Sequence, residues 1–156
     1  MSEEAIRTQV GTILGEVAAV GKVYSYGVVA VTIEDFAKAF LADDGTICGW
    51  RISRESSEEK YDDPAESTAK HTFKLTGYKA LSVVNGSDAV WQALLNAICG
   101  RFRFDHYLSG INDSGATQVT QVSPMQILKS DERLFFDSVL CHYAELAITV
   151  EELITS

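Results

Sequence analysis

Side chains that could support nucleophilic or metal-dependent catalysis do not come together in this sequence. The one Cys-His neighbour pair is Cys141-His142, and the residues around it alternate as they do in a strand. Because adjacent side chains of a strand point to opposite faces, this pair cannot form a hydrogen bond there. His71 and His106 are isolated, and neither a His-x-x-x-His nor a His-Glu-x-x-His spacing occurs. We therefore predict no catalytic residue and no set of metal ligands.

Cofactor sites are not indicated either. The glycines Gly11, Gly15, Gly21 and Gly27 form neither a G-x-G-x-x-G pattern nor a P-loop. Carboxylates are plentiful, but runs such as Glu58-Glu59 are more typical of solvated surface than of a general acid and base. We predict no cofactor, and the spacing of these residues supports no enzyme.

The charge balance argues against a nucleic-acid-binding module. The 156 residues contain 13 Lys and Arg against 22 Asp and Glu, a net charge of −9, and acidic groups are in excess in both halves. Phosphate contacts need a basic face, which this composition does not favour. Arg101-Phe102-Arg103-Phe104 interleaves cations with rings that could stack on bases, but cations at the end of a helix are also explained by the helix dipole.

The composition is that of one soluble domain over residues 1–156. A hydrophobic content of 46% with 22% charged residues is sufficient for a single compact core. No window approaches roughly 18 apolar residues, and the acidic start Met1-Ser2-Glu3-Glu4 is unlike a secretory signal, so we expect neither a membrane span nor export. Three widely separated cysteines predict reduced thiols packed in the core and folding in a reducing cytoplasm.

Three segments have helical periodicity. Apolar residues recur every three to four positions over 2–18 and, most regularly, over 87–104, where Ser87 is the expected N-cap. A shorter helix begins at Thr32, whose spacing to Asp35 is that of a capping box, and ends near 43–45. Each helix has one apolar face, so all three are expected to pack on a common sheet.

The remaining regular segments are predicted strands. Alternation marks 46–54, 71–78, 117–122 and 135–153, and 22–26 is a short strand or an extended loop. Residues 55–69 are acidic and polar, which predicts a flexible acidic loop. The strands on either side of it can pair as a long β-hairpin arm. We therefore expect an α+β fold, with one mostly antiparallel sheet of four to five strands packed against about three helices.

Several local patterns then coincide in order along the chain. They are Ile6-Arg7 in the first helix, Gly49-Trp50-Arg51-Ile52-Ser53-Arg54 before the acidic segment, His71-Thr72-Phe73-Lys74-Leu75-Thr76-Gly77-Tyr78 after it, and Leu140-Cys141-His142-Tyr143-Ala144-Glu145-Leu146 leading into Ile148-Thr149-Val150-Glu151-Glu152. Over nearly its whole length the chain resembles the tail terminator proteins of tailed bacteriophages, especially the small ones of siphophages and Mu-like phages. These proteins belong to the tail-completion and head-tail joining machinery.

The resemblance implies a structural virion protein without catalysis. Such a subunit forms a hexameric ring on the head-proximal end of the tail tube, stops tube polymerisation and joins the head-tail connector protein. The expected partners are thus further copies of the chain, the tail tube protein and the connector, and the expected location is the virion tail after synthesis in the host cytoplasm. The ring also surrounds the DNA path, where an acidic lining would repel phosphates without binding them.

The candidate assembly interface is the strand-loop-strand segment 51–74, with residues 55–69 ordering on assembly. Its candidate residues are Arg51, Arg54, Glu55, Glu58, Glu59, Tyr61, Asp62, Asp63, Glu66 and His71. Two alternatives remain open. Another neck protein, such as a head-completion or connector subunit, would bind the portal side and would not cap tubes. A small enzyme or ligand-binding domain would need a concave pocket with convergent polar groups.

Overall fold

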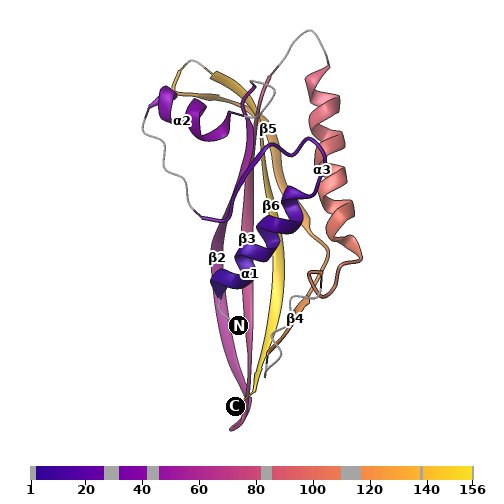
Figure 1. Cartoon of the computed structure of the whole chain (residues 1–156). Coiled ribbons are helices and arrows are strands. Elements are labelled where there is room, and N and C mark those ends of the chain that lie inside the picture. Colours follow the sequence, from indigo (N-terminus) through magenta and orange to yellow (C-terminus); the bar gives the residue numbers. More distant parts are fainter. Residues whose placement is uncertain are drawn as a thin grey trace.

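The computed structural model describes residues 3–26, 32–41, 46–81, 86–109, 117–137 and 139–155. It has the predicted α+β fold, in which one long sheet carries helices on both faces (Figure 1). Helices α1 (Glu3–Gly15) and α3 (Ser87–Arg103) pack on one face, which we call the helix face. Helix α2 (Ile33–Phe40) packs on the opposite, outer face near one end of the sheet.

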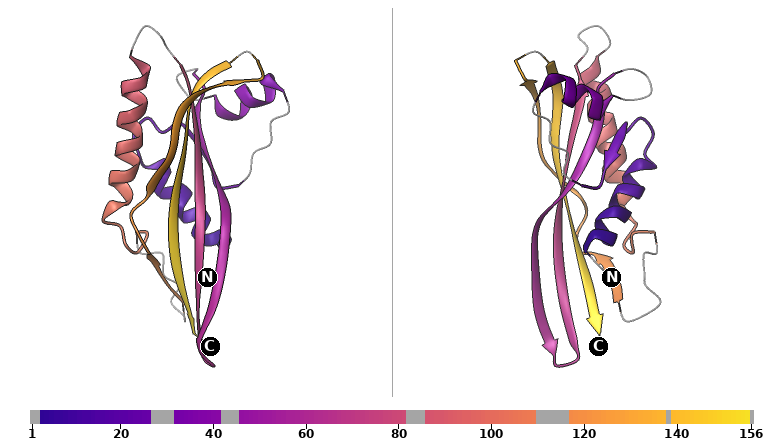
Figure 2. Two further views of the ribbon diagram at one scale, coloured as in Figure 1. Left: turned by 180° about the vertical axis from the view of Figure 1, so that it is seen from behind. Right: turned by 60° about the vertical axis from the view of Figure 1, so that its left-hand side comes forward.

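The sheet is mixed, and six strands lie in the described part of the chain. They are β1 (Lys22–Tyr24), β2 (Cys48–Asp63), β3 (Glu66–Ala80), β4 (Thr117–Gln121), β5 (Gln126–Phe135) and β6 (Val139–Thr155). Their order is β1-β2-β3-β6-β4, with β5 also paired to β6. β1 runs parallel to β2 and every other pair is antiparallel. The sheet is strongly twisted along its length (Figure 2).

β2 and β3 form a long hairpin that extends beyond the helices (Figure 2). The prediction of a loop over residues 55–69 is wrong, because β2 continues to Asp63 and β3 begins at Glu66. At the intervening turn, Asp63 Oδ1 accepts a hydrogen bond of 2.6 Å from the Ala65 N–H. The strands continue through this polar segment because opposite charges such as Glu58 and Lys70 face each other across them. We call residues 54–74 the arm.

A β-bulge at the base of the arm changes which side chains of β2 point to the helix face. Before it, Trp50 and Ile52 are fully buried in the core under α1 and α3. The register then shifts between Arg54 and Ser56. Beyond the shift Ser57 takes the helix face, where its hydroxyl lies 2.7 Å from His71 Nδ1. The two-residue alternation by which a strand is recognised in a sequence is therefore interrupted at this point.

The main core lies between the helix face and helices α1 and α3. Its centre is a stacked pair of indoles, Trp50 from β2 and Trp91 from α3, with ring centroids 5.5 Å apart and planes 17° apart. Gly77 of β3 is the register partner of Trp50, and a Cβ on Gly77 would lie 2.5 Å from the Trp50 ring. Glycine is therefore required at position 77 so that the indole can lie flat across β3.

A second, smaller core fixes α2 to the outer face. Phe36 and Phe40 of α2 pack against Tyr78 of β3 with ring centroids 5.3 and 5.1 Å away. Arg133 of β5 lies 3.9 Å from the centre of the Tyr143 ring, a cation–π contact on the same face. The predicted capping of α2 is confirmed, since Thr32 Oγ1 accepts a hydrogen bond from the Asp35 N–H at 3.2 Å. Its predicted end near 43–45 lies outside the described residues.

Two local predictions differ from the structure. The N-cap of α3 is Gly86, with a left-handed φ of 58°, and Ser87 lies inside the helix with its hydroxyl 2.8 Å from His142 Nε2. Ser87 thus holds a neighbouring strand through a buried hydroxyl and does not cap the helix. The predicted final strand over 135–153 corresponds to β6, but its predicted start is wrong because β6 begins at Val139 and Phe135 ends β5. β5 was not predicted because its side chains are mostly exposed and show no alternation of buried and exposed residues.

Candidate assembly surface

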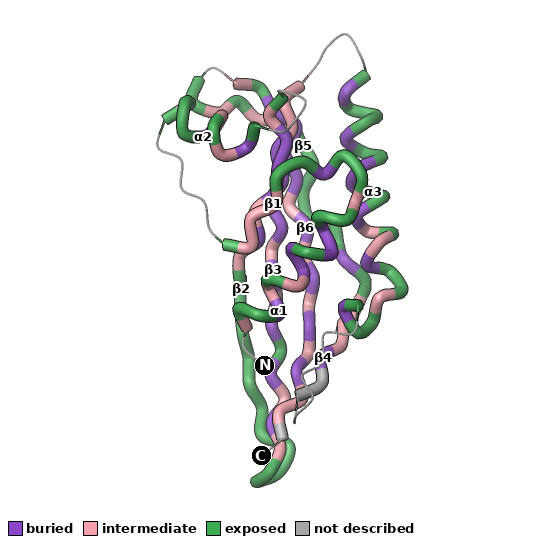
Figure 3. The backbone as a smooth tube through the Cα atoms, in the orientation of Figure 1, coloured by how far each residue is buried: buried purple, intermediate pink, exposed green. Residues whose placement is uncertain are grey.

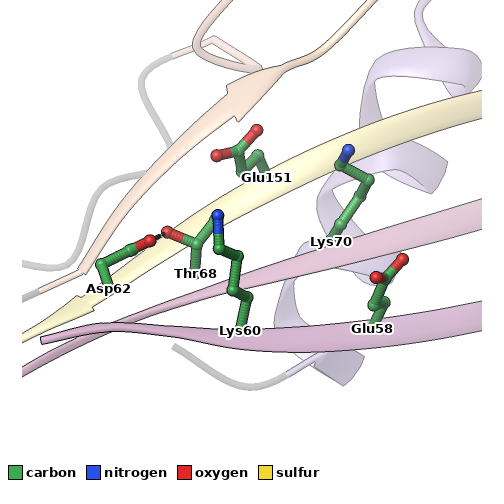
Figure 4. A pocket seen from close by; sticks show the side chains of 6 residues that line it. All are labelled: Glu58, Lys60, Asp62, Thr68, Lys70 and Glu151. Atoms are coloured by element: carbon green, nitrogen blue, oxygen red, sulfur yellow. Dashed lines mark hydrogen bonds between the residues drawn. The ribbon is translucent and has the colours of Figure 1, made fainter.

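The outer face of the arm is a polar surface shared by three strands. Glu58 of β2, Lys70 of β3 and Glu151 of β6 are register partners in one row, so negative, positive and negative side chains alternate across the sheet. Figure 4 shows the hollow around this row, which is lined by Glu58, Lys60, Asp62, Thr68, Lys70 and Glu151. The Thr68 hydroxyl donates a hydrogen bond to Asp62 Oδ2 and closes one side of it. No described helix covers these residues, and β2 is exposed along the arm (Figure 3).

An ion-pair network continues this surface toward the base of the arm. Lys74 Nζ lies 3.1 Å from Glu145 Oε1 and 3.9 Å from Glu55 Oε2. Lys129 Nζ of β5 approaches the other oxygen of Glu145 at 3.7 Å. Burial alone would raise the pKa of the Glu145 carboxyl, but the hydrogen bond from Lys74 and the charges of Lys74, Lys129 and Arg133 lower it below its ordinary value. Glu145 thus ties the arm to β5.

This network predicts an acid-dependent loss of stability. Because the folded-state pKa of Glu145 is lowered, its contribution to the free energy of unfolding is complete above the unfolded pKa and is lost as the pH falls through the folded value. We expect Glu145→Gln to destabilise the protein at neutral pH and to flatten the decline of stability below about pH 5. Urea unfolding at a series of pH values measures both effects, and an unchanged slope in the variant would contradict the prediction.

The helix face of the arm holds polar contacts that include two predicted interface residues, His71 and Glu59. His71 is 7% exposed, with Nε2 3.2 Å from Glu152 Oε2 and Nδ1 next to the Ser57 hydroxyl. Further out, the Ser67 hydroxyl donates a hydrogen bond of 2.9 Å to Glu59 Oε1. The structure therefore places His71 and Glu59 in contacts within the subunit, on the side opposite the charged row.

The other predicted residues are distributed along the arm and its base. Arg51 forms a hydrogen bond with the Tyr78 hydroxyl. Burial raises the pKa of this phenol, and its effect is larger than the opposite effect of Arg51. Arg54 lies 3.9 Å from Glu3 of α1 and Glu55 joins Lys74, so both belong to the base. Tyr61, which is 83% exposed, lies near the tip together with Asp63 and Glu66. Of the predicted set, the structure brings Glu58 and Asp62 together in the lining of the hollow.

Four residues of the hollow were missed by sequence reasoning, namely Lys60, Thr68, Lys70 and Glu151. Lys60 and Thr68 fall in the segment predicted as a loop and Lys70 lies beside it, where no register could be assigned. Glu151 is opposite Lys70 only because β6 pairs with β3 along almost its entire length. The alternation of β6 was the available signal, since it places Glu145, Thr149 and Glu151 on one face.

Comparisons with known proteins assign no function to this chain. The sequence matches no protein-family model and no curated protein. A function must therefore be inferred from the arm, its charges and its edges, together with the local sequence patterns.

The Cys141-His142 pair takes opposite faces of β6, as the strand interpretation predicts. Cys141 lies in the second core, where burial raises the pKa of its thiol to about 11 and disfavours a reactive thiolate. His142 is 2% exposed on the helix face and stacks on Trp91. One nitrogen of His142 and one carboxylate oxygen each of Asp88 and Glu132 lie within 4.8 Å of one another. Among the described residues, these three side chains form a group whose atoms could bind a metal ion. Both carboxylates are exposed, and we assign no ion to the group.

The described helices are also informative about membranes. None of them is long and apolar enough to span a bilayer.

Proposed function

We propose that this protein is a tail terminator of a tailed bacteriophage. Copies of the chain form a ring, which the family resemblance makes a hexamer, on the head-proximal end of the tail tube. The ring stops tube polymerisation and offers its other side to the head-tail connector protein. The role is structural, takes place in the virion and requires neither a cofactor nor catalysis.

The observation that carries this proposal is the arm. The β2 strand of this hairpin continues beyond the helices and is exposed from Arg54 to Asp63, including Tyr61 near the tip, so it contributes little to the core of its own subunit. Its outer face presents charges of both signs in a fixed register, which favours specific polar contacts over non-specific adhesion. Such an element is suited to reach a neighbouring subunit or the tube.

The charge of the chain supports the same proposal. Five carboxylates and two cations occupy residues 52–63, and the whole chain carries a net charge of −9. A ring of acidic subunits around a DNA path produces a negative potential that keeps phosphates from adhering to the wall. Passage of the genome then needs no base-specific or phosphate-specific contact.

The test is assembly on tail tubes. We expect the purified protein to form rings whose population rises with concentration, measured by native mass spectrometry, and to bind one end of polymerised tail-tube protein in electron micrographs. Added during tube polymerisation, it should shorten the length distribution at substoichiometric amounts. As a matched pair, Tyr61→Ala should weaken capping, whereas Val90→Ala, at an exposed position of α3 far from the arm, should leave it unchanged.

Two outcomes would overturn the proposal. A protein that stays monomeric at all concentrations, with and without tubes, cannot be a ring-forming terminator. A protein that forms rings and binds the capsid portal side while leaving tube length unaffected would instead be another neck protein, such as a connector subunit.

A further inference from the structure

A short loop covers the outer side of β4 and displays two aromatic rings. The Gln121 N–H at the end of β4 donates a hydrogen bond of 2.7 Å to the His106 carbonyl, so this side of β4 is occupied within the chain. In the same loop the side chains of Phe104 and Tyr107 are 85% and 50% exposed. Phe104 is the most exposed large hydrophobic side chain among the described residues. We call residues 103–107 the aromatic loop.

The aromatic loop is held in one conformation by contacts within the subunit. The Gln121 side-chain amide donates hydrogen bonds of 2.8 and 2.6 Å to the Phe102 and Asp105 carbonyls. The Asp105 carboxylate accepts a hydrogen bond of 2.8 Å from the Ser109 hydroxyl. Leu108 is fully buried and has a left-handed φ of 49°, a strained conformation that persists only where the surroundings enforce it. Rings that are fixed in this way lose little conformational entropy on binding.

The aromatic loop also presents one available cation. The Arg101 guanidinium, one helical turn closer to the core, is already 2.7 Å from Glu16 and 2.9 Å from Asp105. Arg103 is exposed next to Phe104 and forms no ion pair with another described residue. One such cation is too few for binding to nucleic acid, which depends on several phosphate contacts. Exposed aromatic rings beside an arginine are instead typical of protein–protein interfaces.

An acidic surface that complements this loop lies at the other side of the sheet. β1 pairs only with residues 49–51 of β2, so no described strand lies beside β2 over residues 52–63. Residues 55–59 have the sequence Glu-Ser-Ser-Glu-Glu, and all five are exposed. They carry three carboxylates and no cation. The two small serines leave room for an aromatic ring between Glu55 and Glu58.

The aromatic loop and this acidic edge lie at the same level along the sheet. Gln121, which holds the loop, is in register with Val150 of β6. Val150 is in register with His71 of β3, and His71 with Ser57 of β2. Figure 1 shows β2 and β4 on opposite sides of the sheet. Two different surfaces at one level allow a head-to-tail contact that can close into a ring, whereas surfaces at different levels would generate a helical filament.

We propose that the aromatic loop of one copy of this chain docks on residues 55–59 of β2 in the next copy. Phe104 lies over the two serines, and the Arg103 guanidinium pairs with the neighbouring carboxylates. Charge favours this contact over one between two acidic edges, where carboxylates would face each other. The inference rests on the proposed function for the existence of the ring, and it adds the two surfaces by which the subunits join.

The experiment exchanges charges between the two surfaces and measures ring formation by native mass spectrometry. One variant carries Arg103→Glu, and the other carries Glu58→Arg together with Glu59→Arg. Each variant alone places like charges across the contact, so it should form no rings at concentrations at which the unaltered chain is assembled. An equimolar mixture should restore rings that contain both variants in equal number, because every contact then joins opposite charges. A folding defect in either variant cannot be repaired by mixing.

The substitution Phe104→Ala tests the apolar part of the contact. It should raise the concentration needed for half-maximal ring formation at least about tenfold, since aromatic anchors contribute strongly to interfaces. Val90→Ala is the matched control, because Val90 is also exposed and lies roughly 20 Å from Arg103 along α3. Neither substitution should change the urea midpoint of the unassembled chain, because both side chains are exposed.

The outcomes distinguish this inference from the proposed function. If the unaltered chain forms rings, unaffected assembly of Arg103→Glu and Phe104→Ala would overturn the docking and leave the tail terminator proposal intact. Failure of the mixed charge variants to assemble would have the same meaning. Binding of a short DNA duplex that is lost in Arg103→Glu, with rings unaffected, would assign the aromatic loop to nucleic acid instead. Absence of any oligomer of the unaltered chain, with or without tubes, would overturn both proposals.

Discussion

Trp91→Ala is expected to destabilise the subunit by about 3–5 kcal/mol, the range for removing a large aromatic side chain from a core. Trp91 is 1% exposed and lies between the Trp50 ring and His142, with centroids 5.5 and 6.1 Å away. Its loss removes the contact that holds α3 against β2 and β6 at once. Because a domain of this size is stable by only about 5–15 kcal/mol, the variant should lose a large fraction of its total free energy of unfolding.

Urea unfolding followed by circular dichroism, at one fixed protein concentration, measures this effect. Trp91→Phe is the conservative comparison and should cost less than Trp91→Ala, because it keeps an aromatic ring in the stack and removes an indole N–H that has no partner among the described residues. Val90→Ala, one position earlier and 51% exposed, should change stability by less than about 0.5 kcal/mol. Equal losses in Trp91→Ala and Val90→Ala would show that the stacked indoles are not the centre of the core.

Gly77→Ala is expected to destabilise the subunit by about 1–3 kcal/mol through overpacking. The added Cβ would lie 2.5 Å from atoms of the Trp50 ring, which is itself fixed between β3 and Trp91. Either the indole or the β3 backbone must move. For a chain of this length, each kcal/mol lowers Tm by about 2–4 °C, so the loss is measurable in a thermal scan.

The same substitution at another glycine gives the matched control. A Cβ on Gly100 of α3 meets nothing within 4 Å, so Gly100→Ala should stabilise the helix by about 0.5–1 kcal/mol. Trp50→Leu should reduce the effect of Gly77→Ala, because a smaller side chain leaves room for the methyl group. Strict additivity of the two substitutions would contradict the steric explanation.

Sequence alone predicted those helices and strands in which apolar residues recur regularly on one face. The stripe of Trp91, Leu95 and Ile98 predicted α3, and all three are buried. The alternation of Trp50 and Ile52 predicted a strand, and its antiparallel partner was correctly placed after the acidic segment. In both cases the spacing of apolar residues reflects hydrophobic burial, which is the main driving force of folding.

The parts that sequence did not predict depend on contacts between distant residues. Residues 55–63 are polar on both faces, so their strand is defined by pairing with β3 and by the bulge near Arg54 rather than by burial. The row that joins Glu58 to Glu151 needs the register of two strand pairs, which no local pattern contains. The candidate surface was consequently predicted as a segment but not as an arrangement of side chains.

The bulge between Arg54 and Ser56 changes whether even- or odd-numbered residues of β2 face the helices. Even-numbered side chains such as Ile52 face the helices before it, and odd-numbered ones such as Ser57 face the same side after it. Deletion of Glu55, the residue of the bulge that has no register partner, would make the pairing of β2 with β3 regular and would keep Ser57 on the side of His71. Insertions or deletions made two residues at a time in each strand would keep every face. β2 can therefore gain or lose a single residue by forming or removing a bulge, while the side chains farther along the arm keep their faces.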